Sequence, residues 1–241
     1  MLVNASRPRR WLIFAVPFLF LGATLWMKTH FAAQYHSINE EDHLVQNLQV
    51  LFYASAAILL FVAAWRFSAQ PRSMRWVVLL AAVALVFIVG EEIQWGQDIF
   101  HFRDPAFFAA NNVENETNVH NLAGIDSRVD YAFMVVGFLG GLGWLIPEIL
   151  VKWIPLRKWF IPPWYLSLYF LPLTLYGLLW KAKTNPAFLG GVLGGWQPFL
   201  DRHLDWWDQE PTELLFAAAC IIVAVGILQL AKQGTGIKAV T

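Results

Sequence analysis

Residues Trp76 to Gly90 read WVVLLAAVALVFIVG, and this wholly apolar stretch is followed at once by Glu91 and Glu92. Its fifteen residues would rise about 22 Å in a helix, whereas the hydrocarbon core of a bilayer is about 30 Å thick. If Arg75 marks one membrane surface, both glutamates lie at membrane depth, where charged side chains generally belong to functional sites. Neighbouring helical positions point about 100° apart, so we expect only one of the pair to face the bundle interior. The alternative is a tilted helix or a thinned bilayer, which would leave both glutamates at the headgroup level.

Five further apolar runs are long enough to cross a bilayer, which takes roughly 17 to 25 helical residues. The six expected spans are Trp11–Met27, Leu48–Trp65, Trp76–Trp95, Tyr131–Ile154, Pro163–Trp180 and Leu214–Ala231. Of the 241 residues, 58% are hydrophobic and only 14% are charged, which is too little polar surface for a water-soluble domain of this size. The sequence therefore predicts an all-α fold, a polytopic membrane helix bundle of about six transmembrane helices. Residues 1–241 form one integral membrane domain.

A seventh apolar stretch, residues 188–200 (FLGGVLGGWQPFL), is short and rich in glycine. Its length suits a re-entrant or interfacial segment better than a full span, so the number of spans is six, or seven if this segment enters the membrane.

Basic residues are unevenly divided between the two sides of such a bundle. With the N-terminus inside, eleven of the 17 lysines and arginines lie on the inner face, as does the C-terminus. This excess predicts an N-in, C-in orientation. All six histidines and 16 of the 17 acidic residues then fall outside or at the outer membrane edge, in segments 28–47, 91–130 and 181–213. Because the net charge is zero, nothing indicates a nucleic-acid partner.

The outer segment after the third span contains Asn112, Glu116 and His120 at intervals of four. A helix there would align the three side chains on one face. Glu116 and His120 would then be able to share a divalent metal such as Zn, with Glu92 as a further ligand. The alternative is that His120 is a hydrogen-bonded structural residue.

Two motifs in this region carry a family resemblance. The segments GEEIQWGQDIF (Gly90 to Phe100) and NVENETNVHN (Asn112 to Asn121) resemble a family of uncharacterised bacterial multipass membrane proteins with a GEE-x-x-WGQ-x-IF segment leading into N-x-Q-x-ETN-x-HN. This chain departs from that pattern at Glu114, in place of glutamine, and at Asp98, in place of a basic residue. The resemblance implies an integral protein of a bacterial inner membrane and brings no activity with it.

A third acidic cluster precedes the last span. Its members are Asp201, His203, Asp205, Asp208, Glu210 and Glu213. Acidic residues near a helix N-terminus interact favourably with the helix dipole. This interaction is a sufficient explanation for the position of Glu210 and one of two explanations for the position of Glu213. Glu213 also begins a span of only 18 apolar residues, so it is placed to reach the same outer cavity as Glu91 or Glu92.

The leading hypothesis is an enzyme that acts on a lipid or lipid-linked substrate at the outer leaflet, a hydrolase or transferase that a metal would assist. The expected catalytic residues are Glu91, Glu92, Glu116, His120 and Glu213. In outline this is similar to the alkaline-ceramidase type of intramembrane hydrolase, although the chain has no matching H-x-x-x-H motif. The alternatives are a metal-free, acid-catalysed isoprenoid cyclase and a non-enzymatic transporter or assembly protein. The expected partners are membrane lipid and a lipid or small-molecule substrate, and the oligomeric state is left open.

Overall fold

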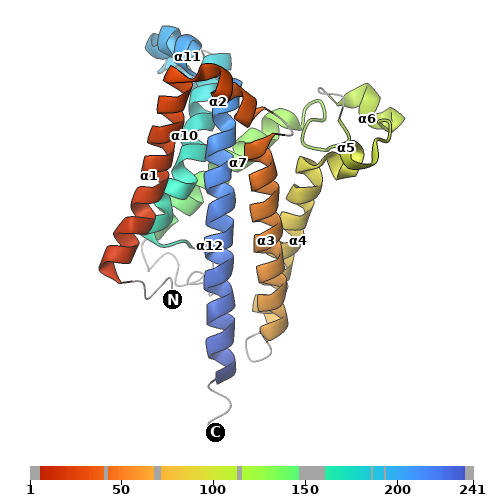
Figure 1. Cartoon of the computed structure of the whole chain (residues 1–241), viewed down its shortest axis with the longest axis vertical. Coiled ribbons are helices and arrows are strands. Elements are labelled where there is room, and N and C mark those ends of the chain that lie inside the picture. The colour runs from red at the N-terminus through yellow and green to blue at the C-terminus, as the bar shows by residue number, and fades with distance from the viewer. Residues whose placement is uncertain are drawn as a thin grey trace.

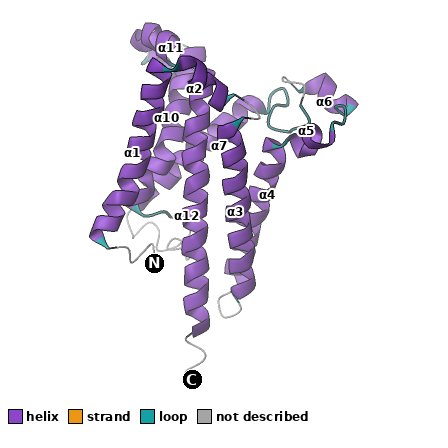
Figure 2. Ribbon diagram, in the orientation of Figure 1, coloured by secondary structure: helices purple, strands orange, loops and turns teal. Residues whose placement is uncertain are grey.

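The computed structural model describes residues 6–40, 43–67, 72–112, 116–146, 161–185, 187–192 and 194–236. These residues are helical or lie in turns, and among them the only β pairing is an isolated bridge between Asn112 and Leu122 (Figures 1 and 2). The long helices of the described part are α1 (Arg7–His30), α3 (Leu44–Arg66), α4 (Arg72–Glu92), α7 (Asp126–Leu142), α10 (Ser167–Thr184) and α12 (Gln209–Gly236). The all-α prediction is thus confirmed.

Four helical stretches of the described chain are long and apolar enough to cross a membrane. They are α1, the stretch that contains α3, α4, and α12. The chain therefore has the helices of an integral membrane protein. The remaining two long helices are shorter, at 17 residues for α7 and 18 for α10.

Successive long helices run in alternating directions, and the start of α1 and the end of α12 lie at the same end of the bundle (Figure 1). The other end, which we call the distal end, carries most of the short helices and turns. They are α2 (Ala32–Asn39), η1 (Gln94–Gly96), α5 (Gln97–Phe100), α6 (Ala106–Asn111), η4 (Phe188–Gly191), η5 (Gly194–Trp196), α11 (Gln197–His203) and η6 (Trp206–Asp208). The described short elements from segments 28–47, 91–130 and 181–213 thus gather at one end of the bundle.

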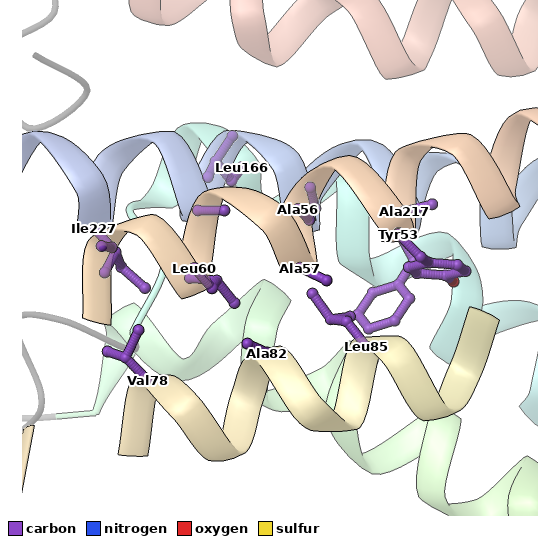
Figure 3. Close-up of a cluster of buried hydrophobic side chains, with 14 of the residues drawn as sticks. Tyr53, Ala56, Ala57, Leu60, Val78, Ala82, Leu85, Leu166, Ala217 and Ile227 are labelled. Carbon is purple, nitrogen blue, oxygen red and sulfur yellow. The ribbon is translucent and has the colours of Figure 1, made fainter. Parts of the chain in front are cut away.

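The centre of the bundle is the packing of α3 against α12 and α4. The fully buried residues of α3 and α12 are largely alanines, among them Ala56, Ala63, Ala64, Ala217 and Ala224. Small side chains let helix backbones approach closely. In a bilayer, where lipid tails are as apolar as the side chains, helices associate mainly through such close packing. On the other side of α3, Leu60 faces Val78 and Ala82 of α4 (Figure 3).

Glycines of α7 let this helix approach α10. A Cβ atom on Gly140 would lie 2.2 Å from the ring of Phe170, so no larger residue fits without a shift. In the same contact, the Thr174 hydroxyl donates a hydrogen bond to the backbone oxygen of Met134 at 2.9 Å. The α7–α10 pair therefore depends on close backbone packing as much as on apolar side chains.

One expectation about the apolar segments needs correction. The fourth span was expected to continue to Ile154, but α7 ends at Leu142 and only a turn, η2 (Gly143–Leu145), follows. Ile146 has an extended backbone (φ −63°, ψ 121°), because the residue before a proline disfavours helical geometry, and Pro147 is next. The rest of that expected span lies outside the described residues. The described part of residues 188–200 forms short turns and the first part of α11 at the distal end, and its placement relative to the membrane stays a prediction.

Asp208 ties the N-terminal helices to the distal end. Its carboxylate forms an ion pair with Lys28 of α1 and accepts a hydrogen bond from the hydroxyl of Tyr35 in α2 at 2.7 Å. It also accepts one from the backbone N–H of Asp205 at 2.8 Å, which closes the turn η6. These contacts hold Trp206, the first residue of η6, in the wall of the cavity described next.

Candidate functional site

A cavity of about 500 Å³ opens at the distal end between α3, α4, α7, α10 and α12. The charged side chains in its wall are those of Glu91, Glu92, Glu116, His120, Asp130, Lys181, Glu210 and Glu213. All five residues that the sequence singled out as catalytic thus lie around one cavity, although they come from α4, a distal loop and α12.

Glu91, the next-to-last residue of α4, is the centre of a hydrogen-bonded network. It is 5% exposed, and one carboxylate oxygen accepts from the backbone N–H groups of Val119 at 2.7 Å and His120 at 2.9 Å. The same oxygen lies 3.3 Å from Nδ1 of His120, while the indole of Trp95 donates to the other oxygen at 2.7 Å. Glu91 therefore holds both the backbone and the ring of His120.

The surroundings of His120 favour its protonated form. Burial alone would lower the pKa of the imidazole, but the hydrogen bond to Glu91 and the negative charges of Glu92, Glu91 and Glu116 outweigh it. The pKa of His120 is accordingly raised above its ordinary value. Because Glu91 engages Nδ1, Nε2 is the nitrogen that this carboxylate leaves for another partner.

A tight turn at the end of α4 brings Trp95 within hydrogen-bonding distance of Glu91. Three consecutive residues have left-handed backbones, Gln94 (φ 49°), Trp95 (φ 53°) and Gly96 (φ 87°), so the chain folds back on the helix end. The Trp95 ring then lies over Gly90, where an added Cβ would be 2.9 Å from it. Gly90 is therefore needed for the ring position from which Trp95 reaches Glu91.

The expected helix through Asn112, Glu116 and His120 is not present, because residues 116–122 form a loop. Asparagine side chains replace the helical hydrogen bonds there: Asn112 donates to the side-chain oxygen of Asn118 at 2.9 Å and accepts from the backbone N–H of Glu116 at 3.3 Å. Such local side-chain bonds compete with helix formation. The loop nevertheless brings Glu116 and His120 to the same cavity.

Amide groups surround the carboxylate of Glu116. It accepts hydrogen bonds from Gln94 at 2.7 Å, from Asn121 at 3.1 Å and from Asn118. With three amide donors around it, Glu116 anchors the loop to the turn after α4. Two of these donors, Asn118 and Asn121, flank His120 in the loop.

The carboxylates of Glu92 and Glu213 accept fewer hydrogen bonds than those of Glu91 and Glu116. Both line the cavity, so the expectation that only one residue of the Glu91–Glu92 pair would face inward is wrong, because the cavity spans the whole end of α4. Gln46 of α3 contacts Glu92 at 3.4 Å, and Gln209 donates to one oxygen of Glu213 at 2.6 Å. Glu213 is only 5% exposed.

Several residues that no sequence motif indicates also shape the site. Asp130 of α7 and Lys181 of α10 form an ion pair in its wall, and Gln49 of α3 donates to the carboxylate of Glu210 at 2.8 Å. Gln46 and Gln49, polar and three positions apart at the start of an apolar span, were the available signal for an inward polar face.

The expected metal ligands do not converge on one point. Among the described residues, no group of three histidine, cysteine, aspartate or glutamate side chains is placed to hold a metal ion. Of the expected set of Glu92, Glu116 and His120, Nδ1 of the histidine contacts Glu91, and amide groups surround the Glu116 carboxylate. The described residues therefore do not fit a metal centre of that composition.

The resemblance of the segments Gly90 to Phe100 and Asn112 to Asn121 stays a prediction. No protein-family model matches the chain, and no curated protein or solved structure is similar to it.

Proposed function

We propose that this chain is a membrane-embedded enzyme that acts on a lipid or lipid-linked substrate, with His120 and Glu91 as a general acid–base pair. The observation that carries the proposal is the fixed imidazole: Glu91 holds the backbone and Nδ1 of His120 at the wall of a cavity of about 500 Å³. A histidine with one nitrogen held by a carboxylate is oriented for proton transfer at the other.

The cavity wall suits an amphiphile. Helix α4 runs toward the distal end, so Phe87 and Ile88 lie one turn deeper than Glu91 and Glu92. Helix α7 runs the other way, and Phe133 therefore lies deeper than Asp130. A polar group would sit among the carboxylates and His120, and an apolar chain would extend toward the bundle interior.

The chemistry that follows is cleavage or transfer of a polar group. Protonated His120 gives its Nε2 proton to the oxygen that leaves as the substrate bond breaks, and then accepts a proton from the attacking water or hydroxyl. Each turnover thus returns the imidazole to its starting form. Glu91 keeps the ring oriented and balances its positive charge, and positioned proton transfer of this kind contributes about 10² to 10⁴ in rate.

The proposed orientation in the membrane places the cavity at the outer leaflet of a bacterial inner membrane. In this topology all six long helices cross, α7 and α10 beside the four that are long and apolar enough, and both termini lie inside. The common end of the termini and the eleven basic residues assigned to that side support the orientation.

The test is lipid conversion by the purified chain in vesicles of total bacterial lipid, with products followed by mass spectrometry. Wild type should deplete one lipid class, whereas Glu91→Gln and His120→Asn should lose conversion by about 10² or more. His203→Asn, an exposed histidine on α11 outside the cavity, serves as the matched control.

Other outcomes would contradict the proposal. Conversion that survives His120→Asn but fails in Glu213→Gln would indicate acid-catalysed cyclisation instead. Ion flux across the vesicles without lipid conversion would indicate a transporter.

A further inference from the structure

We infer that the cavity recognises a primary ammonium group on an amphiphile, held between Glu92 and Glu213. The inference rests on the proposed function, because it takes this cavity as the substrate site, and it names the substrate class. The cavity, the charges in its wall and a carboxylate oxygen of Glu213 that no described residue donates to support it independently of the acid–base pair.

The balance of charge in the wall selects a cation. Lys181 is paired with Asp130, and His120 is paired with Glu91. Among the described residues, no lysine, arginine or histidine forms an ion pair with Glu92 or Glu213, although the charge of His120 also acts on Glu92. Both glutamates line the cavity. An anionic group placed between them would be repelled, whereas a positive group would be attracted to both carboxylates.

Glu213 supplies an acceptor that the described residues do not satisfy. The side chain is more than nine-tenths buried and lines the cavity, and Gln209 donates to Oε1 only. No described residue donates to Oε2. Oε2 is not one of the buried side-chain atoms that lack a partner, so it is open to the cavity and can accept from a ligand that brings its own N–H groups.

The kind of cation follows from the rest of the wall. No three acidic or histidine side chains of the described chain converge as a metal would require, so a larger cation with several hydrogens spans the carboxylates better. The indoles of Trp180 and Trp206 also line the cavity, with ring centroids 5.3 Å apart in an edge-to-face arrangement. Aromatic rings attract ammonium groups, and the apolar residues below accommodate an attached chain.

The experiment is native mass spectrometry of the purified full chain, incubated with equal amounts of three amphiphiles with the same saturated chain: hexadecylamine, hexadecyltrimethylammonium and hexadecanol. Wild type should retain hexadecylamine at least about tenfold more than either other amphiphile. The trimethylammonium compound has the charge without N–H donors, and the alcohol has a donor without the charge.

Two substitutions remove the carboxylates one at a time. Glu92→Gln and Glu213→Gln should each lower hexadecylamine retention about tenfold, which corresponds to the loss of one charge-assisted hydrogen bond. Glu40→Gln, at an exposed glutamate of the same end outside the cavity, should leave retention unchanged. Monodisperse elution of each variant shows that it has folded, and either one suffices for the test.

Three results would overturn the inference: equal retention of the three amphiphiles, unchanged selectivity in both glutamine variants, or displacement of hexadecylamine by an equal concentration of soluble ethanolamine. The last would show a site for small amines. The His120→Asn variant separates the two proposals, because it should keep amine selectivity while losing lipid conversion. Selective amine binding by a wild type that converts no lipid would contradict the proposed function alone, and conversion without amine selectivity would contradict this inference alone.

Discussion

Oε2 of Glu91 accepts a hydrogen bond from the backbone N–H of His120 at 2.9 Å and lies 3.3 Å from Nδ1 of the same residue. A single carboxylate at the end of α4 thus fixes a histidine 29 positions later in the chain. The ring and its backbone cannot move separately while this contact holds, so the direction of Nε2 is set by the end of a helix.

The pH dependence of stability should reflect the raised pKa of His120. Its pKa is higher in the folded than in the unfolded chain, so the bound proton stabilises the fold. This stabilisation is complete below the ordinary histidine pKa of about 6.5 and is lost as the pH rises through the raised folded value. Thermal unfolding in detergent should therefore show the advantage of wild type over His120→Asn shrinking from acidic to alkaline pH. An advantage that grows with pH would contradict the assignment.

Glu91 and His120 should behave as one unit in a double-mutant cycle. Residues that act together are strongly non-additive, so Glu91→Gln combined with His120→Asn should convert lipid about as slowly as the worse single variant. Histidine NMR on the Glu91→Gln variant should also show the His120 pKa lowered, because the hydrogen bond to a charged partner is gone. Additive losses together with an unmoved His120 pKa would separate the two residues.

Gly90→Ala should weaken the turn after α4. The new methyl group would lie 2.9 Å from the Trp95 ring, and displacement of that ring breaks its hydrogen bond to Glu91. Overpacking of this kind costs about 1 to 3 kcal/mol, measurable by denaturation in mixed micelles. Gly22→Ala on α1 is the matched control, since no atom lies within 4 Å of its added Cβ. Equal effects at both positions would contradict this account of Gly90.

Gly140→Ala should loosen the α7–α10 contact, because its Cβ would lie 2.2 Å from Phe170. The loss should be partly rescued by Phe170→Leu, which removes ring atoms from the point of overlap. A positive coupling of about 0.5 to 3 kcal/mol in the free energy of unfolding is expected for residues in direct contact. If the two substitutions changed the free energy of unfolding additively, the overlap between Gly140→Ala and Phe170 would not be the cause of the destabilisation.

The orientation predicts which single cysteines an impermeant thiol reagent labels in cells. In a Cys220→Ala background, cysteine at His203 should be labelled from outside, and cysteine at Arg66 only after the membrane is opened. The two positions lie at opposite ends of the bundle, on α11 and at the end of α3. Labelling of the Arg66 position from outside would reverse the proposed topology.

The long helices were predictable from local pattern, because roughly 20 apolar residues in a row leave few alternatives to a buried or membrane helix. The short apolar stretch ahead of Glu91 and Glu92 was also enough to indicate both glutamates as candidate site residues, since charges at membrane depth are costly. The end of α7 was missed, although Pro147 was visible in the sequence, because the apolar run continues past it.

The loop around His120 was harder to predict. Spacing of four between Glu116 and His120 suggested a helix, but asparagine side chains at positions 112, 118 and 121 make the hydrogen bonds that hold a loop instead. The partner of His120 comes from α4, far along the chain, and spacing within one segment carries no information about such a contact. Lys181 was missed for the same reason, whereas the spacing of Gln46 and Gln49 was a local signal that went unused.

The anchoring of residues 119 and 120 by Glu91 has a consequence for biogenesis. When α4 leaves the ribosome, the donors that will satisfy its terminal carboxylate have not yet been synthesised, since Val119 follows 28 residues later. Until then, Glu91 has only nearby partners such as Trp95 and the surrounding water. The end of α4 therefore gains its full set of hydrogen-bond donors only after the following loop has been synthesised, and a chain truncated before Val119 would leave one oxygen of Glu91 without them.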